Sequence, residues 1–370
     1  MFVASLDPIH YGHINTIERA SLAFNELTVA LAVNETKTTL FTMDERVEMA
    51  RKSLSHLQNV KVDSFSGMTS DYAFRNNIRY HVRGVRSSAD LEFEKTLHDN
   101  LRAQNPNLET FILFSDPTLS HMSSSAVKTI QGNQGDIHAY VPLHVKQAVE
   151  QRLSGQFILG VTGVPGSGKS YVSSKLAVYS KSQTESHHID LDKLAHKMYT
   201  EENYLSQIRP LLIKEFGSET INSDGTVNRK YLGDKAFESQ ITLMSLNSIV
   251  HPFLIQRFRE EIKGKKGLIL LDAAILSENN LEYLTNNNFV LVTADDQTQY
   301  KRLQERNWTN GQIAKRKATQ LKTENKRNKI QLAISKAQHG IIIEYDTSSD
   351  AGSIKELYES VSRYFNGFKK

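Results

Sequence analysis

The stretch FILGVTGVPGSGKS at residues 157–170 decides the fold of the second half of the chain. Its last eight residues, Gly163 to Ser170, form a complete G-x-x-x-x-G-K-[ST] motif. An apolar run precedes the motif and a helical pattern, SYVSSKLAVY, follows it, which is the strand–loop–helix context that the motif requires. Backbone N–H groups of such a loop bind phosphates, and the helix start adds positive potential. The sequence therefore predicts a P-loop nucleotide-binding domain.

The chemistry of this loop assigns a role to each of its side chains. Lys169 neutralises the β- and γ-phosphates of ATP, and the hydroxyl of Ser170 binds the Mg²⁺ that accompanies the nucleotide. The remaining predicted ATP contacts are backbone contacts from the loop itself: Val164, Pro165, Gly166, Ser167 and Gly168.

Four further residues are candidates for the remaining parts of a phosphoryl-transfer site. Asp190 follows the next strand, at the sheet edge where ligands bind in open α/β folds, and could accept the proton of an attacking hydroxyl. A plain helix-capping role for Asp190 stays open beside this one. Asp272 ends the apolar run LILLD, as a magnesium-binding carboxylate of a P-loop domain would. Arg306 and Arg316 suit a lid over ATP, with solvated helix charges as the alternative.

Several motifs in the second half occur in the order found in the dephospho-CoA kinase family. The segment resembles that family through GVPGSGKS, Asp190-Leu191-Asp192, Asp224-Gly225, Asn228–Gly233, His251-Pro252, Asp272 with Glu278, and Arg306, Arg316 and Gln320. Family members commonly read D-x-P after the strand, where this chain has Asp272-Ala273-Ala274. The resemblance implies transfer of the γ-phosphoryl group of ATP to the ribose 3′-hydroxyl of dephospho-CoA, with Asp190 as the base and Arg306 binding ATP.

The first half contains a second candidate nucleotide site around His10-Tyr11-Gly12-His13. This H-x-G-H sequence begins an amphipathic helical pattern, INTIERASLAF, where a helix start favours anions. A metal-binding or core histidine pair is the alternative. Nucleotidyl transfer needs cations around the reacting phosphates, and Lys37, Arg83 and Arg86 are candidates, with Arg83 placed at a strand end. The serine run 123–125 precedes a helix and could equally be a helix cap.

Together these residues resemble the phosphopantetheine adenylyltransferase family over nearly all of residues 1–153. The resemblance rests on LDPIHYGH, LFTMDERVEMA, VDSFSGM, RGVR, DLEFE, SHMSSSAVK and Gly135-Asp136. It implies that His13 binds the ATP phosphates and stabilises the transition state. It implies phosphopantetheine contacts from Ser5, Lys37, Thr69 and Arg83. The implied ATP contacts are Ser5, Leu6, His13, Gly84, Val85, Arg86, Glu94, Leu119, Ser120, His121, Met122, Ser123, Ser124 and Ser125.

The two halves together predict a two-domain α/β protein. A Rossmann-like nucleotidyltransferase domain at residues 1–154 is followed by a P-loop kinase domain with a parallel sheet and a helical lid at 155–370. The resemblances imply the last two steps of coenzyme A biosynthesis, as in bifunctional coenzyme A synthase. ATP, 4′-phosphopantetheine and dephospho-CoA would be the substrates, and Mg²⁺ would accompany ATP. The nearest alternative is a nicotinamide mononucleotide adenylyltransferase fused to a ribosylnicotinamide kinase.

Composition limits the other classes of function. The chain of 370 residues has a formal net charge of only +4 and no cysteine, which disfavours a nucleic-acid binder and excludes disulfides and thiolate sites. No apolar run approaches the roughly 20 residues of a membrane span. The first residues, MFVASLDP, lack the pattern of a signal peptide. We therefore expect a cytoplasmic protein that binds neither nucleic acid nor membrane. The oligomeric state is left open, a homo-oligomer included.

One expectation concerns the first strand, of which only Phe2 to Ala4 precede Ser5. The adenylyltransferase family has a longer strand that ends in a glycine-containing turn, where this chain has Ala4. We expect the first domain to be less stable than the second for this reason. A nucleotide-sensing first domain without turnover is the corresponding alternative.

Overall fold

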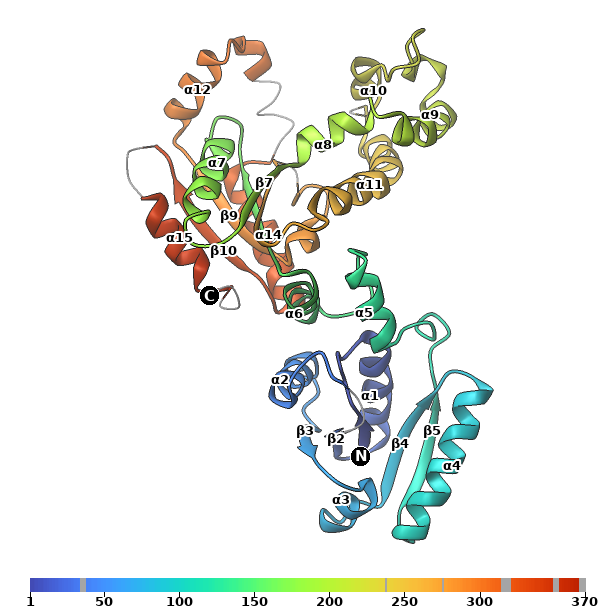
Figure 1. Cartoon of the computed structure of the whole chain (residues 1–370). Coiled ribbons are helices and arrows are strands. Elements are labelled where there is room, and N and C mark those ends of the chain that lie inside the picture. Colours follow the sequence, from blue (N-terminus) through green and yellow to red (C-terminus); the bar gives the residue numbers. More distant parts are fainter. Residues whose placement is uncertain (34–37, 237, 275, 314–320, 349–352, 366–370) are drawn as a thin grey trace. The chain divides into compact units, whose positions relative to one another are not determined.

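Alternating strands and helices build two separate α/β units, Met1–Leu153 and Ser154–Lys370, each around its own parallel sheet (Figure 1). This computed structural model describes residues 1–33, 38–236, 238–274, 276–313, 321–348 and 353–365. The predicted α/β class is confirmed in both halves.

The first unit alternates strand and helix almost strictly. Its elements are β1 (Phe2–Ala4), α1 (Tyr11–Ala23), β2 (Leu27–Ala32), α2 (Met43–Ser53), β3 (Val60–Phe65), α3 (Thr69–Arg75), β4 (Tyr80–Val85), α4 (Ser88–Gln104), β5 (Glu109–Phe114), α5 (Ser124–Gly132) and α6 (Leu143–Ser154). The sheet has the order β3-β2-β1-β4-β5, so β1 is central. Helices α1, α2, α5 and α6 pack on one face of it, and α3 and α4 on the other.

Two local features of this unit follow from its sequence. Helix α2 begins with a capping box, in which Thr42 accepts from the Glu45 N–H and Glu45 accepts from the Thr42 N–H. Strand β4 is longer than predicted, because Gly84 and Val85 continue its ladder opposite Leu113 and Phe114 of β5. Arg83 therefore lies inside the strand, and the prediction that the strand ends at this residue is wrong.

The second unit combines a sheet with a helical extension. Its elements are β6 (Gln156–Gly163), α7 (Lys169–Ser180), β7 (Ser186–Asp190), α8 (Leu191–Met198), α9 (Glu202–Phe216), η1 (Ser218–Thr220), α10 (Arg229–Ala236), α11 (Gln240–Ile262), β8 (Gly267–Asp272), η2 (Glu282–Thr285), β9 (Asn288–Thr293), α12 (Asp296–Glu305), α14 (Thr323–Ala337), β10 (Ile341–Asp346) and α15 (Ile354–Ser362).

The sheet of the second unit has the order β10-β9-β6-β8-β7. Strand β6 is buried along its whole length, as expected for a central strand covered on both faces. Helices α7 and α15 pack on one face, and α11 and α14 on the other. Helices α8 to α11 form an extension beyond strand β7 (Figure 1).

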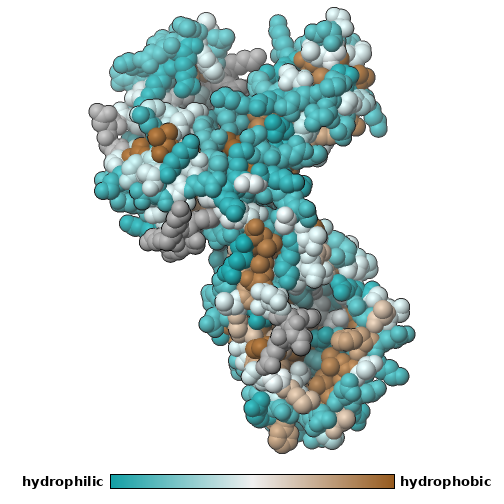
Figure 2. Space-filling view, viewed as in Figure 1, coloured by the Kyte–Doolittle hydropathy of each residue, from teal (hydrophilic) through white to brown (hydrophobic). Residues whose placement is uncertain are grey.

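The surfaces of the two units differ in character. Figure 2 shows a mostly hydrophilic face with smaller hydrophobic patches on the second unit, and more extensive hydrophobic patches on the first. Several large apolar side chains of the first unit are exposed, among them Phe93 and Phe114. None of the helices described by the structure combines the length and the apolar character needed to span a membrane.

Candidate active sites

A cleft of about 330 Å³ opens in the first unit where strands β1 and β4 end and helix α1 begins. This is the edge of a parallel sheet at which ligands bind. Its walls come from the H-x-G-H turn, the end of β4, the first half of α4 and the loop before α5. The lining residues are Phe2, Ala4, His10, Gly12, His13, Thr16, Arg83, Gly84, Arg86, Asp90, Phe93, Glu94, Ser115, Leu119, Met122, Ser123 and Ser124.

The two histidines of the motif stack on each other in this cleft, with ring centroids 3.6 Å apart. The His13 Nδ1 atom accepts a hydrogen bond from the His10 backbone N–H at 3.4 Å. Burial, followed by the charges of His10, Arg83 and Arg86, holds the pKa of His13 well below its usual value. A neutral ring that accepts at Nδ1 carries its proton on Nε2, so His13 is a neutral hydrogen-bond donor.

The ring of His10 is also buried. Burial, and secondarily the charge of Arg86, lowers its pKa to about 4. Its Nδ1 atom has no hydrogen-bond partner among the described residues. The site therefore presents two uncharged rings rather than two cations near neutral pH.

Arginines supply the positive charge of the cleft, and both are held by carboxylates. Arg83 donates from Nε and Nη2 to the two oxygens of Glu94, at 2.7 and 2.5 Å, and from Nη1 to the Val3 carbonyl. Arg86 donates to Asp90 at 3.0 Å and to the Met122 carbonyl at 3.1 Å. These contacts link strand β4 to β1, to α4 and to the loop before α5.

Sequence reasoning missed the side chain that joins the loops behind the cleft. The buried carboxylate of Asp7 accepts from the backbone N–H groups of Leu40 and Phe41, at 2.9 and 3.0 Å, and from Lys128 Nζ at 3.0 Å. Asp7 thus holds together three segments that lie far apart in the sequence. The quoted motifs contain Asp7 and Lys128, but nothing in their spacing indicates that they pair.

The structure brings together most of the predicted first-site residues and leaves others outside the cleft. Those that line it are His13, Arg83, Gly84, Arg86, Glu94, Leu119, Met122, Ser123 and Ser124. Those that do not line it are Ser5, Leu6, Thr69, Val85, Ser120, His121 and Ser125. Leu6 and Val85 have buried core side chains, so only their backbone could contact a nucleotide. Lys37 lies outside the described residues.

Two of these residues also have structural roles. Ser123 is the N-cap of α5, since its hydroxyl accepts from the Ala126 N–H, as the capping alternative predicted. The Ser124 hydroxyl donates to the Pro8 carbonyl at 2.8 Å, which fixes the start of α5 against the turn after β1.

The P-loop of the second unit connects β6 to α7. Gly166 and Gly168 have φ angles of 81° and 86°, in the left-handed region that favours glycine. A Cβ atom on Gly166 would lie 2.6 Å from the Gln299 carbonyl oxygen, so the loop leaves no room for a side chain there. Gly168 is the N-cap of α7 and provides no side chain to cap the helix. No capping side chain therefore competes with a phosphate for the first backbone N–H groups of α7.

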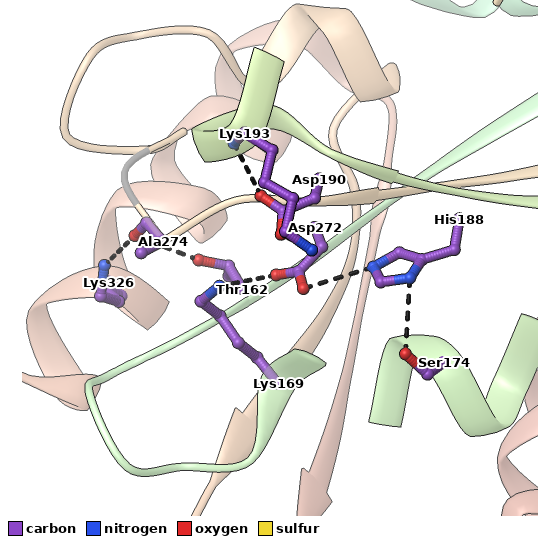
Figure 3. A network of polar contacts seen from close by, with 9 residues as sticks. All are labelled: Thr162, Lys169, Ser174, His188, Asp190, Lys193, Asp272, Ala274 and Lys326. Atoms are coloured by element: carbon purple, nitrogen blue, oxygen red, sulfur yellow. Dashed lines mark hydrogen bonds and ion pairs between the residues drawn. The ribbon is translucent and has the colours of Figure 1, made fainter. Parts of the chain in front are cut away.

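Asp272 lies next to this loop at the end of β8 and pairs with its lysine. Lys169 Nζ donates to Asp272 Oδ1 at 2.7 Å, and His188 Nε2 lies 3.4 Å from Oδ2 (Figure 3). Burial alone would raise the pKa of Asp272. Hydrogen bonds from His188, Lys169 and Ser170 and the charge of Lys169 together hold it below the usual value. Asp272 is therefore an ionised, buried carboxylate beside the phosphate loop.

Asp190 is the register partner of Asp272 on the neighbouring strand β7. Its Oδ1 atom accepts from the Lys193 N–H at 3.0 Å, so Asp190 is the N-cap of α8, as the capping alternative predicted. Its Oδ2 atom lies 3.3 Å from Lys193 Nζ. The two carboxylates end adjacent strands, and the capping bond fixes the orientation of Asp190 (Figure 3).

Sequence reasoning also missed a buried lysine behind this site. Lys326 has no exposed surface and donates to the Ala274 carbonyl (Figure 3). It also donates to Glu278. Burial lowers the pKa of Lys326, and the charge of Glu278 opposes that effect. Lys326 lies in α14, a helix rich in charged residues, and only the fold shows that its side chain faces inward.

The predicted lid arginines lie apart from this network. Arg306 ends α12 and is exposed, and Arg316 and Gln320 lie outside the described residues. Arg302, one turn earlier in α12, is the arginine that contacts the P-loop, through the Gly166 carbonyl at 3.3 Å.

Comparisons with known proteins agree with this division. The dephospho-CoA kinase family matches residues 157–339, and a cytidylyltransferase-like family matches residues 1–130. A phosphopantetheine adenylyltransferase from Shouchella clausii is 38% identical over 147 residues, which are 40% of this chain and 92% of the relative. The protein of the same name from Bdellovibrio bacteriovorus is 36% identical over 153 residues, 41% of this chain and 96% of the relative. The crystal structure of TT1252 from Thermus thermophilus covers 58% of this chain and 99% of its own, at 22% identity and a TM-score of 0.43.

Proposed function

We propose that the two units catalyse consecutive reactions, because the chain belongs to the phosphopantetheine adenylyltransferase family through its first unit and carries a dephospho-CoA kinase domain in its second. The chain is a bifunctional transferase of the last two steps of coenzyme A biosynthesis. Both resemblances predicted from the sequence are confirmed by these matches. We assign the adenylyltransferase to residues 1–154 and the kinase to residues 155–370.

In the first reaction, a phosphate oxygen of 4′-phosphopantetheine attacks the α-phosphorus of ATP, and pyrophosphate leaves. Such a transfer requires no covalent bond to the protein, only orientation and compensation of charge. His13 would donate from Nε2 to the phosphate oxygens as their charge increases. Arg86 would add positive charge to the ATP side of the cleft. The contacts of Ser5, Lys37, Thr69 and Arg83 with phosphopantetheine remain predictions from the family.

In the second reaction, the ribose 3′-hydroxyl of dephospho-CoA attacks the γ-phosphorus of ATP, and ADP leaves. Asp190 would accept the proton of this hydroxyl, while Lys169 compensates the charge of the transferred group. The observation that supports this assignment is the adjacency of Asp190 and Asp272 at the ends of paired strands, with Lys169 bonded to Asp272. One carboxylate can face the acceptor while the other stays beside the nucleotide phosphates.

The residues at the phosphate loop fit the Mg²⁺ that would accompany ATP. Ser170 and the ionised Asp272 present a hydroxyl and a carboxylate oxygen, the ligand types that Mg²⁺ prefers. Mg²⁺ usually takes only one or two ligands from the protein and the rest from phosphates and water. When bound, the ion would compensate phosphate charge during transfer. Ser170 would bind it, and Asp272 would orient it.

The assignment is tested by offering the purified full chain a set of acceptors with ATP and Mg²⁺. We expect pyrophosphate release only with 4′-phosphopantetheine and ADP release with dephospho-CoA. The alternative fusion would instead release pyrophosphate with nicotinamide mononucleotide and phosphorylate ribosylnicotinamide. That result would contradict this assignment. Pyrophosphate release with neither acceptor, while ADP is formed from dephospho-CoA, would indicate a nucleotide-sensing first unit.

A further inference from the structure

Two side chains outside the P-loop motif are hydrogen-bonded to the backbone of the loop. Arg302 of α12 donates from Nη1 to the Gly166 carbonyl at 3.3 Å and to Thr347 Oγ1 at 2.7 Å. Its Nη2 donates to the Thr347 carbonyl at 2.7 Å. The Thr347 hydroxyl lies 2.7 Å from the Ser167 carbonyl oxygen and can donate its proton there. The result is a chain of hydrogen bonds from Arg302 through Thr347 to the loop.

The direction of these bonds is set by the chemistry of the groups. A guanidinium can only donate, so the Thr347 oxygen accepts from Arg302. The hydroxyl then has one proton, and its shortest acceptor is the Ser167 carbonyl, since the Thr293 carbonyl is farther away at 3.1 Å. The positive charge on Arg302 polarises the hydroxyl and strengthens its bond to the loop.

Holding the Ser167 carbonyl also fixes the next backbone N–H group. In a trans peptide, the carbonyl of one residue and the N–H of the next point in opposite directions. The Gly168 N–H must therefore point away from Thr347. The Ser167 N–H is already bonded to the Val164 carbonyl at 3.1 Å, so this half of the loop is held at several points. Gly168 in particular needs such support, because glycine has the greatest backbone freedom of any residue.

We propose that Arg302 and Thr347 are positioning residues for ATP binding in the kinase unit. They keep the Ser167–Gly168 peptide oriented so that its N–H can bind a nucleotide phosphate. Neither residue belongs to the P-loop motif: Arg302 lies in the last turn of α12, and Thr347 directly follows β10. This inference rests on the proposed role of the P-loop as the kinase ATP site.

The experiment compares three variants of the full chain. Thr347→Val removes the hydroxyl and keeps the shape, whereas Thr347→Ser keeps the hydroxyl. Thr285→Val is the matched control, since Thr285 also donates from a buried hydroxyl to a carbonyl, that of Glu282 at 2.9 Å, away from the loop. The first readout is the KM for ATP of ADP formation with dephospho-CoA. The second is hydrogen–deuterium exchange of the peptide containing residues 163–170, measured without nucleotide.

We expect Thr347→Val to raise the KM for ATP about tenfold, with a much smaller change in kcat, because a loop carbonyl and a guanidinium N–H both lose their partner. We also expect faster exchange in residues 163–170. Thr347→Ser should stay within about twofold of wild type for both readouts. Thr285→Val should change stability alone, and adenylyl transfer should be unaffected in all three variants.

Three outcomes would overturn the inference. The first is an unchanged KM and unchanged exchange in Thr347→Val, and the second is a Thr347→Ser variant as impaired as Thr347→Val. The third is a tenfold rise of KM in Thr285→Val, which would indicate general destabilisation. Absence of kinase turnover in the wild type would contradict the proposed function instead, and the exchange experiment would still decide whether the pair holds the loop.

Discussion

The two units place their candidate phosphate sites at the same point of the fold but build them from different chemical groups. In each, a central strand, β1 or β6, ends at the site and a helix, α1 or α7, begins there. The second unit offers backbone N–H groups at a helix start whose cap, Gly168, has no side chain. The first unit fills the start of its helix with His10 and His13, and the ring of His13 bonds back to the His10 backbone.

The difference extends to charge. Lys169 and Asp272 form an ion pair beside the P-loop, whereas the first cleft holds two neutral histidines between arginines that are paired with carboxylates. A site built from backbone is encoded in one short motif. A site built from side chains depends on partners from many segments, and its properties change with pH.

The substitution with the largest expected effect removes the P-loop lysine, and it tests whether the two units act independently. Lys169→Ala should lower ADP formation with dephospho-CoA by about 10³-fold, because it removes the cation beside the transferred phosphate. It also leaves Asp272 buried without its main partner, so the second unit should lose stability. Rates of ADP and pyrophosphate formation, measured on the same preparation, check this. Loss of both rates together would contradict the separation of the sites.

The reciprocal change in the first unit is His13→Ala. We expect pyrophosphate formation to fall by about 10²–10³-fold, since a preorganised donor to developing charge is worth roughly 3–4 kcal/mol, while the kinase rate is unchanged. His144→Ala is the matched control, because His144 is a half-buried histidine of the same unit that does not line the cleft. Equal losses in the two variants would show that stability, rather than the His13 donor, explains the effect.

Acid should unfold the first unit before the second. The pKa of His10 is lowered to about 4, that of His81 to about 3 and that of His144 to about 4, each mainly by burial, and that of His13 is well below its usual value. In the second unit, burial also lowers the pKa of His251. In the unfolded chain these histidines take up protons below about pH 6.5, whereas in the folded first unit they stay uncharged. The free energy of unfolding of the first unit therefore falls as the pH falls from about 6.5 toward 4.

Each of these rings that stays uncharged down to about pH 4 contributes to the size of the effect. The lowered pKa of His10 and that of His81 should each reduce the free energy of unfolding of the first unit by about 2–3 kcal/mol at pH 4.5, relative to pH 7. Calorimetry of the full chain between pH 7 and 4.5 should show the transition of the first unit moving to lower temperature much more than that of the second. Parallel shifts of both transitions would contradict the contrast in histidine environments.

The sequence was sufficient for the parts of each site that are local in the chain. It predicted the P-loop between a strand and a helix, and the carboxylates at the ends of β7 and β8. It could not predict partners that meet only in the fold, such as Asp7 with Lys128 or Arg302 with Thr347. Nor could it show that Lys326 is buried, because a charged helix pattern does not reveal which face another element covers.

The smallest expected effects test whether the units unfold independently. Thr42 caps α2 in the first unit, and Ser239 caps α11 in the second, each with a capping box. Thr42→Ala and Ser239→Ala should each cost about 1 kcal/mol, which corresponds to roughly 2–4 °C for domains of this size. Each substitution should shift only the transition of its own unit. A shift of both transitions by one substitution would show that the two units unfold as one.

The most direct test of two consecutive reactions in one chain is product analysis of Asp190→Asn supplied with 4′-phosphopantetheine, ATP and Mg²⁺. Asparagine keeps the capping bond to the Lys193 N–H but is a far weaker base. Wild type should form coenzyme A with equal amounts of pyrophosphate and ADP. The variant should form pyrophosphate at the wild-type rate and accumulate dephospho-CoA, with ADP formation reduced by about 10²-fold or more. Undiminished coenzyme A formation in Asp190→Asn, or loss of pyrophosphate formation along with it, would contradict this account.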